Sequence, residues 1–310
     1  MITYQGDPSA WDAPPDGSAV AIGVFDGVHL GHRQVLESLG DVDPSLTRVA
    51  MTFGTHPASL LSPDGAPSRL STLKRRFDLF EEAGIDRIAV LGFDEEMRTM
   101  TPEDFVRRFL VEGLNARFVV VGVGFRFGQG AVGTTEMLID LGRRYGFEVE
   151  VIDIACNDGT EIRSTTIRDA LIGGDVERAA MMLGRPYDLE GIVVAGDGRG
   201  RQIGVATANV SFPAVLTVPR HGVYAVMAVV DGVGHPAVAN LGIRPTFGGE
   251  DEVLEVHILG FDRDLYGRHL RIEFVARIRD EIRFDSVDDL LIQIHDDMVS
   301  ASERLVDHTS

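Results

Sequence analysis

The sequence predicts a doubly wound α/β domain followed by a six-stranded all-β barrel with a C-terminal helix. In the first half, short β-branched runs recur about thirty residues apart with amphipathic stretches between them, which is typical of βαβ units and a parallel sheet. After Leu189 the strand-like runs follow one another without helices, which favours an antiparallel barrel that closes on itself. Gly184, Arg185 and Pro186 interrupt a helical pattern, so we expect domains over 1–184 and 185–310.

The expected elements of the first domain alternate between strand and helix. Strands are predicted over 19–25, 49–53, 88–91, 118–121 and 148–154, and helical patterns after His29, from Ser71, from Thr101, and over 134–145, 165–171 and 176–183. At Thr101 a capping hydroxyl is followed by a proline and two acidic residues, which predicts a helix start. Ligands bind beyond the carboxyl ends of the strands in such sheets, so the loops that follow these strands are candidate sites.

The expected elements of the second domain are short strands and one long helix. The strands are predicted over 191–195, 206–210, 222–230, 237–241, 254–259 and 269–277. The helix is predicted over 286–306, with Ser286 as its N-cap and one apolar face that should pack on the barrel. The residues that mark this face are Leu290, Leu291, Ile294 and Met298.

The composition limits which classes of partner and which cellular compartment we expect for this protein. Acidic residues outnumber basic ones by 48 to 29, and a net charge of −19 predicts no nucleic-acid partner. No apolar run approaches the roughly 18 to 20 residues of a membrane helix, and residues 1–16 are acidic and rich in proline, unlike a secretory leader. We therefore expect a cytoplasmic protein without a membrane partner, and the oligomeric state stays open. The single cysteine, Cys156, excludes an intramolecular disulfide and a cysteine-based zinc site.

The most informative stretch is 23–32, which reads Gly-Val-Phe-Asp-Gly-Val-His-Leu-Gly-His between the first strand and the first helix. A helix N-terminus at this place favours phosphate, and His29 and His32 could donate hydrogen bonds to a triphosphate as charge moves to a leaving pyrophosphate. The structural alternative is that both histidines only cap or pack at the helix start. A metal site made of His29, His32 and His56 is the weaker interpretation, because no carboxylate or thiolate has a recognisable ligand spacing.

These residues resemble the nucleotidyltransferase signature of the bifunctional riboflavin kinase/FAD synthetase family. Residues 52–57, 121–128 and 163–168 resemble its further motifs, in the same order. The resemblance implies that this half binds ATP and FMN, forms FAD and releases pyrophosphate, with His29 and His32 as catalytic residues. It assigns nucleotide binding to Gly23, Phe25, Asp26, Gly31, His56, Ser164, Thr165 and Arg168, and flavin binding to Phe125 and Arg126.

The second half resembles the riboflavin kinase part of the same family. The glycine-rich stretch 191–204 suits close approach to phosphate and implies nucleotide binding by Gly196, Arg199 and Arg201. The resemblance further implies that Thr207 and Asn209 hold Mg²⁺ and the ATP phosphates, that Glu255 is the general base toward the riboflavin 5′-hydroxyl, and that Arg279 and Phe284 lie near the flavin. The structural alternative for Glu255 is a solvated residue on an alternating strand.

The chain also departs from the family pattern at several loop positions. Where the family usually has Asn, Pro, Asp or Asn, and Ser, this sequence has Val24, Thr55, Gly124 and Arg163, and Val205-Ala206 replaces Phe-Pro. The resemblance implies conversion of riboflavin to FMN and of FMN to FAD with ATP and Mg²⁺. Two alternatives remain: a diverged paralogue that acts on another nucleotide or a modified flavin, or with only one active half, and a non-catalytic flavin-binding or regulatory protein.

Overall fold

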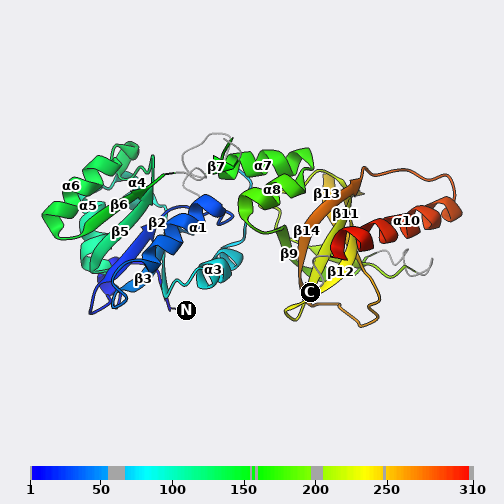
Figure 1. The fold of residues 1–310 in the computed structure, drawn as a ribbon, viewed down its shortest axis with the longest axis horizontal. Coiled ribbons are helices and arrows are strands. Elements are labelled where there is room, and N and C mark those ends of the chain that lie inside the picture. Colours follow the sequence, from blue (N-terminus) through cyan, green and yellow to red (C-terminus); the bar gives the residue numbers. More distant parts are fainter. Residues whose placement is uncertain are drawn as a thin grey trace. The chain divides into compact units, whose positions relative to one another are not determined.

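The chain folds into two compact units. The computed structural model describes residues 2–54, 67–153, 156–157, 160–196, 205–246 and 249–306. The first unit comprises Met1–Ser68 and Thr72–Arg163, and the second comprises Arg69–Ser71 and Ser164–Ser310 (Figure 1). Within the described ranges, every helix is too short or too polar to cross a bilayer.

The first unit is built on a six-stranded parallel sheet in the order β1-β4-β3-β2-β5-β6. The strands are β1 (Ile2–Tyr4), β2 (Ser18–Ile22), β3 (Thr47–Phe53), β4 (Arg87–Leu91), β5 (Ala116–Gly122) and β6 (Glu148–Ile152). All five residues of β2 are buried, as expected for a strand covered on both faces. The doubly wound prediction is confirmed, although β1 was not predicted.

Helices cover both faces of this sheet (Figure 1). On one face α5 (Pro102–Phe105), the π-helical η3 (Val106–Gly113) and α6 (Thr135–Tyr145) pack against Val20 and Ile22. On the other face α1 (Leu30–Glu37) and α3 (Leu73–Glu82) pack against Ala19 and Ala21. The period-two alternation of β2 thus divides its side chains between two apolar cores. The remaining helical segments of this unit are η1 (Pro8–Ala10), η2 (Ser38–Gly40), α4 (Glu95–Thr99) and η4 (Gln129–Ala131).

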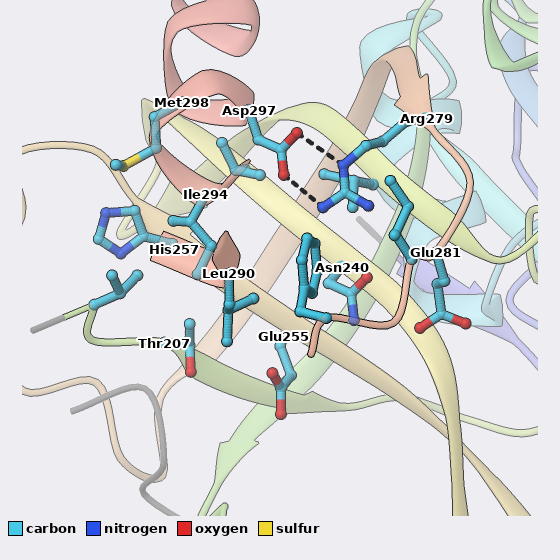
Figure 2. Close-up of a pocket in the computed structure, with 15 residues that line it drawn as sticks. Thr207, Asn240, Glu255, His257, Arg279, Glu281, Leu290, Ile294, Asp297 and Met298 are labelled. Atoms are coloured by element: carbon cyan, nitrogen blue, oxygen red, sulfur yellow. Dashed lines mark hydrogen bonds and ion pairs between the residues drawn. The ribbon is translucent and has the colours of Figure 1, made fainter. Parts of the chain in front are cut away.

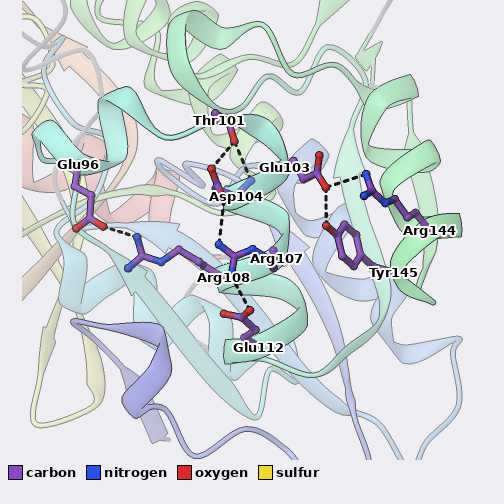
Figure 3. Close-up of polar contacts among 9 residues, drawn as sticks. All are labelled: Glu96, Thr101, Glu103, Asp104, Arg107, Arg108, Glu112, Arg144 and Tyr145. Carbon is purple, nitrogen blue, oxygen red and sulfur yellow. Dashed lines mark hydrogen bonds and ion pairs between the residues drawn. The ribbon is translucent and has the colours of Figure 1, made fainter.

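The predicted helix start at Thr101 is confirmed. The Thr101 hydroxyl accepts a hydrogen bond from the backbone N–H of Asp104 at 3.1 Å, and Pro102 occupies the first helical turn. Charged residues around it form a surface network, in which Arg107 donates to Asp104 at 3.0 Å and to Glu112 at 2.8 Å (Figure 3). Solvent screens such exposed pairs, so this network shapes the surface more than it stabilises the fold.

The second unit contains a closed six-stranded antiparallel barrel in the order β10-β13-β12-β11-β14-β9, as predicted. Its strands are β9 (Tyr187–Val194), β10 (Ala208–Ser211), β11 (Gly222–Val230), β12 (Val233–Thr246), β13 (Gly249–Ile258) and β14 (His269–Arg279). Helix α10 (Val287–Leu305) starts at Ser286, whose hydroxyl accepts from the N–H of Asp289. Its Ala301 and Leu305 pack on Ala225 and Ala276 of the barrel wall, which confirms the predicted docking.

The boundary between the compact units in the sequence lies between Arg163 and Ser164, about twenty residues before the expected boundary at 184/185. Helices α7 (Ser164–Gly173) and α8 (Val176–Leu183) pack on each other, and α8 also contacts β9 and β14. A hydrogen bond of 2.9 Å from the N–H of Arg220 to the carbonyl of Leu171 ties α7 to the second unit as well. The helix predicted before Gly184 is therefore present as α8, but it packs on the barrel of the second unit. The small β7 (Cys156–Asn157) and β8 (Thr160–Glu161) precede α7.

We expect the Phe274→Ala variant to destabilise the second unit alone by roughly 3–5 kcal/mol. Phe274 is completely buried, and its ring lies 5.2 Å from that of Tyr224 and 6.3 Å from that of Tyr187, so its loss opens a core cavity. Trp11, the single tryptophan, lies in the first unit, so its fluorescence follows the unfolding of that unit in urea. Circular dichroism follows the unfolding of both units. Ile292→Ala, at an exposed position of α10, is the control. A shifted Trp11 transition would show that the units do not unfold separately.

Candidate active sites

The carboxyl edge of the parallel sheet gathers three loops. Strand β2 lies between β3 and β5, and Ile22 is in register with Met51 on one side and with Val121 on the other. The loops that leave these strands therefore start side by side at one edge. They contain the predicted motifs at 23–32 and 121–128 and the described part, 52–54, of the motif at 52–57, so the structure brings these segments together as expected for a ligand site.

The first of these loops has an unusual backbone. Phe25 and Val28 have positive φ values of 52° and 41°, in the left-handed region that bulky and β-branched residues rarely adopt. The Phe25 ring is buried against the rings of His32 and Phe80, at 5.3 Å and 5.5 Å. A side chain at Gly23 would meet that ring at 3.0 Å. Strain of this kind is typical of functional loops. The buried Phe25 ring anchors the loop to the core of the unit.

His29 and His32 lie stacked at the start of α1. Their ring centroids are 3.6 Å apart, and His29 Nδ1 accepts a hydrogen bond of 3.2 Å from the backbone N–H of His32. His29 thus does cap the helix, as the structural alternative proposed. The pKa of His32 lies well below its ordinary value, because burial disfavours the imidazolium and because His29 and Arg76 add positive charge nearby. A neutral His32 can act as a hydrogen-bond donor without carrying charge into the site.

Arg76 of α3 ties two of the loops together. Its Nη1 lies 2.9 Å from the carbonyl oxygen of Val24, 3.0 Å from the hydroxyl of Thr52 and 3.1 Å from the carbonyl oxygen of Phe53. The side chain is buried, and its charge strengthens these bonds. The sequence motifs did not predict a role for Arg76. The sequence did contain a sign of this role. Arg76 precedes Leu79 by three residues and Phe80 by four, which places an arginine on the apolar face of the helix.

The third loop carries the predicted flavin-binding residues. Phe125 is partly buried and stacks on Phe127 with ring centroids 5.5 Å apart, whereas Arg126 is exposed. Gly124 has a φ of +79°, a conformation that Asn and Asp also tolerate, and a Cβ there would meet no other atom within 4 Å. The departure at Gly124 therefore removes a polar group without altering the backbone requirement.

Some predicted residues of the first site are not placed with it. Thr55 and His56 lie outside the described residues. Ser164, Thr165 and Arg168 belong to α7 and hence to the second compact unit, and Arg168 is buried there. Arg163, the last residue of the first unit, is exposed. The phosphate-binding role of the α7 residues stays a prediction.

The barrel carries a cavity of about 300 Å³ between its outer wall and α10 (Figure 2). Leu254 and Val256 point into the barrel and are buried, so the alternation of β13 places Glu255 on the outer face. Glu255 is in register with Asn209 of β10 on one side and Asn240 of β12 on the other. Its carboxylate therefore lies in a row with two amides, and it is more than a solvated strand residue.

The segment before β10 is held by a histidine from the neighbouring strand. His257 lies two residues after Glu255 on β13, and its Nδ1 is 2.7 Å from the carbonyl oxygen of Ala206. This contact fixes the backbone next to Thr207, where the family's proline is missing. A Cβ at Gly196 would lie 2.2 Å from Nδ2 of Asn209, so glycine leaves the space that this amide occupies. Arg199 and Arg201 lie outside the described residues.

The opposite wall of the cavity is formed by α10 and the segment before it. Arg279, at the end of β14, donates from Nε and Nη2 to the Asp297 carboxylate at 2.9 Å and 2.7 Å (Figure 2). Its guanidinium carbon lies 6.0 Å from the centroid of the Phe284 ring. The apolar lining residues are Val205, Val223, Val238, Ile282, Phe284, Leu290, Ile294 and Met298. Leu290, Ile294 and Met298, expected to pack on the barrel, thus line a cavity instead.

The two walls of the cavity differ in polarity. The barrel strands contribute oxygen and nitrogen atoms of Thr207, Asn240, Glu255 and His257, whereas α10 and the segment before it contribute mostly hydrocarbon, together with the charged side chains of Arg279, Glu281 and Asp297. Such a site suits a ligand with a flat apolar body and a hydroxylated tail. Among the described residues no cluster of three His, Cys, Asp or Glu could hold a metal ion by itself. The hydroxyl of Thr207 and the amide of Asn209 suit a hard cation that keeps water and phosphate oxygens as its other ligands.

Comparisons with known proteins agree with this geometry. The model of the FAD synthetase family matches residues 12–166, and that of riboflavin kinase matches residues 183–305. The bifunctional riboflavin kinase/FMN adenylyltransferase of Escherichia coli K12 is 39% identical over 98% of this chain and 97% of its own length. The chain belongs to this family. The Bacillus subtilis relative of the same description is 37% identical over 92% of this chain and 91% of its own length.

A solved structure shares the fold of this family member from end to end. It is a crystal structure from Streptococcus pneumoniae, described as a macrolide-efflux protein, with 30% identity and a TM-score of 0.89. The superposition covers 97% of this chain and 99% of the other. The motif-based assignment to the riboflavin kinase/FAD synthetase family is thus confirmed, and so is the predicted fold class.

The Arg76→Met variant should lower FMN adenylylation at least about tenfold, since each lost charge-assisted bond to the loops is worth roughly 1.5–3 kcal/mol. The kinase step, which belongs to the other unit, should keep its rate. Lys74→Met is the matched control, because Lys74 lies two residues earlier on the same helix, is exposed and forms a surface ion pair with Asp78. Equal adenylylation by both variants would show that Arg76 does not order the site.

The low pKa of His32 makes the first unit less stable in acid. Because the folded state binds a proton to His32 less readily than the unfolded state, stability should fall as pH drops below the unfolded value of about 6.5. The contribution has a limiting slope of about 1.4 kcal/mol per pH unit. Urea unfolding followed by Trp11 fluorescence should therefore show a shallower pH dependence for His32→Gln than for the unaltered protein. Identical slopes would contradict the neutral, buried state of His32.

Proposed function

We propose that the chain phosphorylates riboflavin to FMN at the barrel cavity and adenylylates FMN to FAD at the edge of the parallel sheet. The observation that carries this proposal is the cavity, in which Glu255 and the amide of Asn240 face the apolar side chains of Phe284, Leu290 and Ile294. Its support comes from the family membership and from the relatives, which are described as enzymes with both activities. The loops at the sheet edge supply the second site.

In the kinase reaction, Glu255 accepts the proton of the riboflavin 5′-hydroxyl as its oxygen forms a bond to the γ-phosphorus of ATP. The bond between that phosphorus and the bridging oxygen breaks, and ADP leaves. Thr207 and Asn209 would hold Mg²⁺, which would neutralise charge on the phosphates. Arg199 and Arg201 bind the ATP phosphates, and Gly196 allows the phosphates to approach the backbone closely. Arg279 and Phe284 contact the flavin. Most of the rate enhancement comes from positioning and charge.

In the adenylyltransferase reaction, a phosphate oxygen of FMN attacks the α-phosphorus of ATP and pyrophosphate leaves. The reaction needs no covalent enzyme intermediate. His29, His32 and the first turn of α1 donate hydrogen bonds to the phosphates as charge grows on the leaving group. The loop residues Gly23, Asp26 and Gly31 shape the nucleotide site, with His56, Ser164, Thr165 and Arg168 as further phosphate ligands. Phe125 and Arg126 contact the flavin.

Both reactions remain in the proposal despite the departures from the family pattern. At two of these positions another side chain holds the backbone, because Arg76 contacts the carbonyl oxygen of Val24 and His257 that of Ala206. We propose that the functional domains are 1–184 and 185–310. We further propose that the enzyme acts in the cytoplasm on riboflavin, FMN and ATP with Mg²⁺, without a nucleic-acid or membrane partner.

Glu255→Ala should lower the rate of FMN formation by roughly 10²- to 10⁴-fold and leave the conversion of supplied FMN to FAD unchanged. The double variant His29→Ala/His32→Ala should show the reverse. The measurement is chromatography of FMN and FAD after incubation with riboflavin, ATP and Mg²⁺. Glu252→Ala, an exposed acid on the same strand, and His269→Ala, an exposed histidine, are matched controls.

The same assay separates the alternatives. FMN that accumulates without FAD would mean that only the kinase half is active. Flavin binding without ATP consumption would mean a binding protein, and turnover of another nucleotide or a modified flavin alone would mean a diverged paralogue. Each of these outcomes would replace the bifunctional proposal.

A further inference from the structure

An acidic side chain interrupts the cavity-facing side of α10. Leu290, Ile294, Asp297 and Met298 follow one another at helical spacing and all line the cavity. Asp297 is 4% exposed, and a carboxylate at such a position is costly unless it is paired. An apolar residue would fill this place on the helix at lower cost. A carboxylate at this position therefore indicates that Asp297 binds a specific partner.

Asp297 holds Arg279 in one orientation. The two bonds to Nε and Nη2 are joined by a third contact, from Gln293 Nε2 to Oδ1 of Asp297 at 3.0 Å. Arg279 also donates from Nη1 to the carbonyl oxygen of Asp280 at 2.9 Å. A guanidinium has five N–H groups, so these contacts leave one N–H on each Nη nitrogen. Arg279 lines the cavity, and its rigid fork can offer these two groups to a bound molecule.

The same pair anchors the segment that completes the cavity wall. Residues 280–286 run from Arg279 to the N-cap of α10 and carry Ile282 and Phe284, which line the cavity. The Arg279–Asp297 pair joins the start of this segment to the third turn of the helix that follows it. The segment is thus closed into a loop whose base is a bidentate ion pair.

We infer that Asp297 is a positioning residue of the riboflavin site, which acts by orienting Arg279 and by fixing the loop that carries Phe284. The inference rests on the proposed assignment of the cavity to riboflavin. Asp297 governs how tightly the flavin is held, whereas proton transfer at Glu255, on the opposite wall, does not depend on it. The chemical class recognised by the Arg279 fork is a hydrogen-bond acceptor of the flavin, such as a ring carbonyl.

The test compares Asp297→Asn with Leu305→Ala. Asp297→Asn keeps the shape but loses the charge and one acceptor, so the riboflavin KM and the Kd from quenching of riboflavin fluorescence should rise about 10- to 100-fold. The kcat should change less than about twofold, and adenylylation of supplied FMN should not change. Leu305 is buried where α10 packs on the barrel, away from the cavity lining, so Leu305→Ala should lower thermal stability and leave the riboflavin KM unchanged.

A merely structural pair would give the opposite result, with lower stability but the same riboflavin KM in Asp297→Asn, and this would overturn the inference. If Asp297→Asn does not fold, the double variant Arg279→Met/Asp297→Leu removes both charges and leaves no buried ion unpaired. It should fold and still bind riboflavin weakly, whereas normal riboflavin binding by it would overturn the inference. Glu255→Ala in the same assay distinguishes a failure of the cavity assignment, because an active Glu255→Ala enzyme would overturn the site and the inference together.

Discussion

The alternation of side chains along the barrel wall is the constraint on which the proposed kinase site depends. Leu254 and Val256 are held in the barrel core, and this fixes Glu255 on the outer face. A shift of one residue in the register of β13 would bury the carboxylate and expose both apolar neighbours, so core packing protects the position of the proposed base. The pairing of β13 with β10 and β12 then places an amide on each side of it.

The docking of α10 turns this outer face into a cavity. Near its end the helix packs closely on small side chains, Ala225 and Ala276, while its first half carries Leu290 and Ile294 over the cavity. Stability and binding therefore come from different parts of one helix. In the first unit the same division holds: buried strands fix where the loops begin, and a buried arginine and two stacked histidines fix how the loops continue.

The sequence predicted those features that local patterns record. Strand alternation, the cap at Thr101 and the spacing of His29 and His32 all depend on neighbours within a few residues, and the structure shows each of them. Arg76 and Asp297 were not predicted, because their contacts join residues 52 and 18 positions apart in the chain. The packing of α8 on β14 was not predicted for the same reason, because these elements are even further apart in the chain. An arginine or an aspartate on an apolar helix face was the visible sign, but the sequence does not say which atom it meets.

A complementation assay separates the two proposed sites. Neither the Glu255→Ala protein nor the His29→Ala/His32→Ala protein should convert riboflavin to FAD alone, because each lacks one of the two proposed sites. A mixture of both, supplied with riboflavin, ATP and Mg²⁺, should accumulate FAD after FMN, since each protein keeps the site that the other lacks. If either protein alone still converts riboflavin to FAD at the unaltered rate, Glu255 or the two histidines do not carry the step assigned to them.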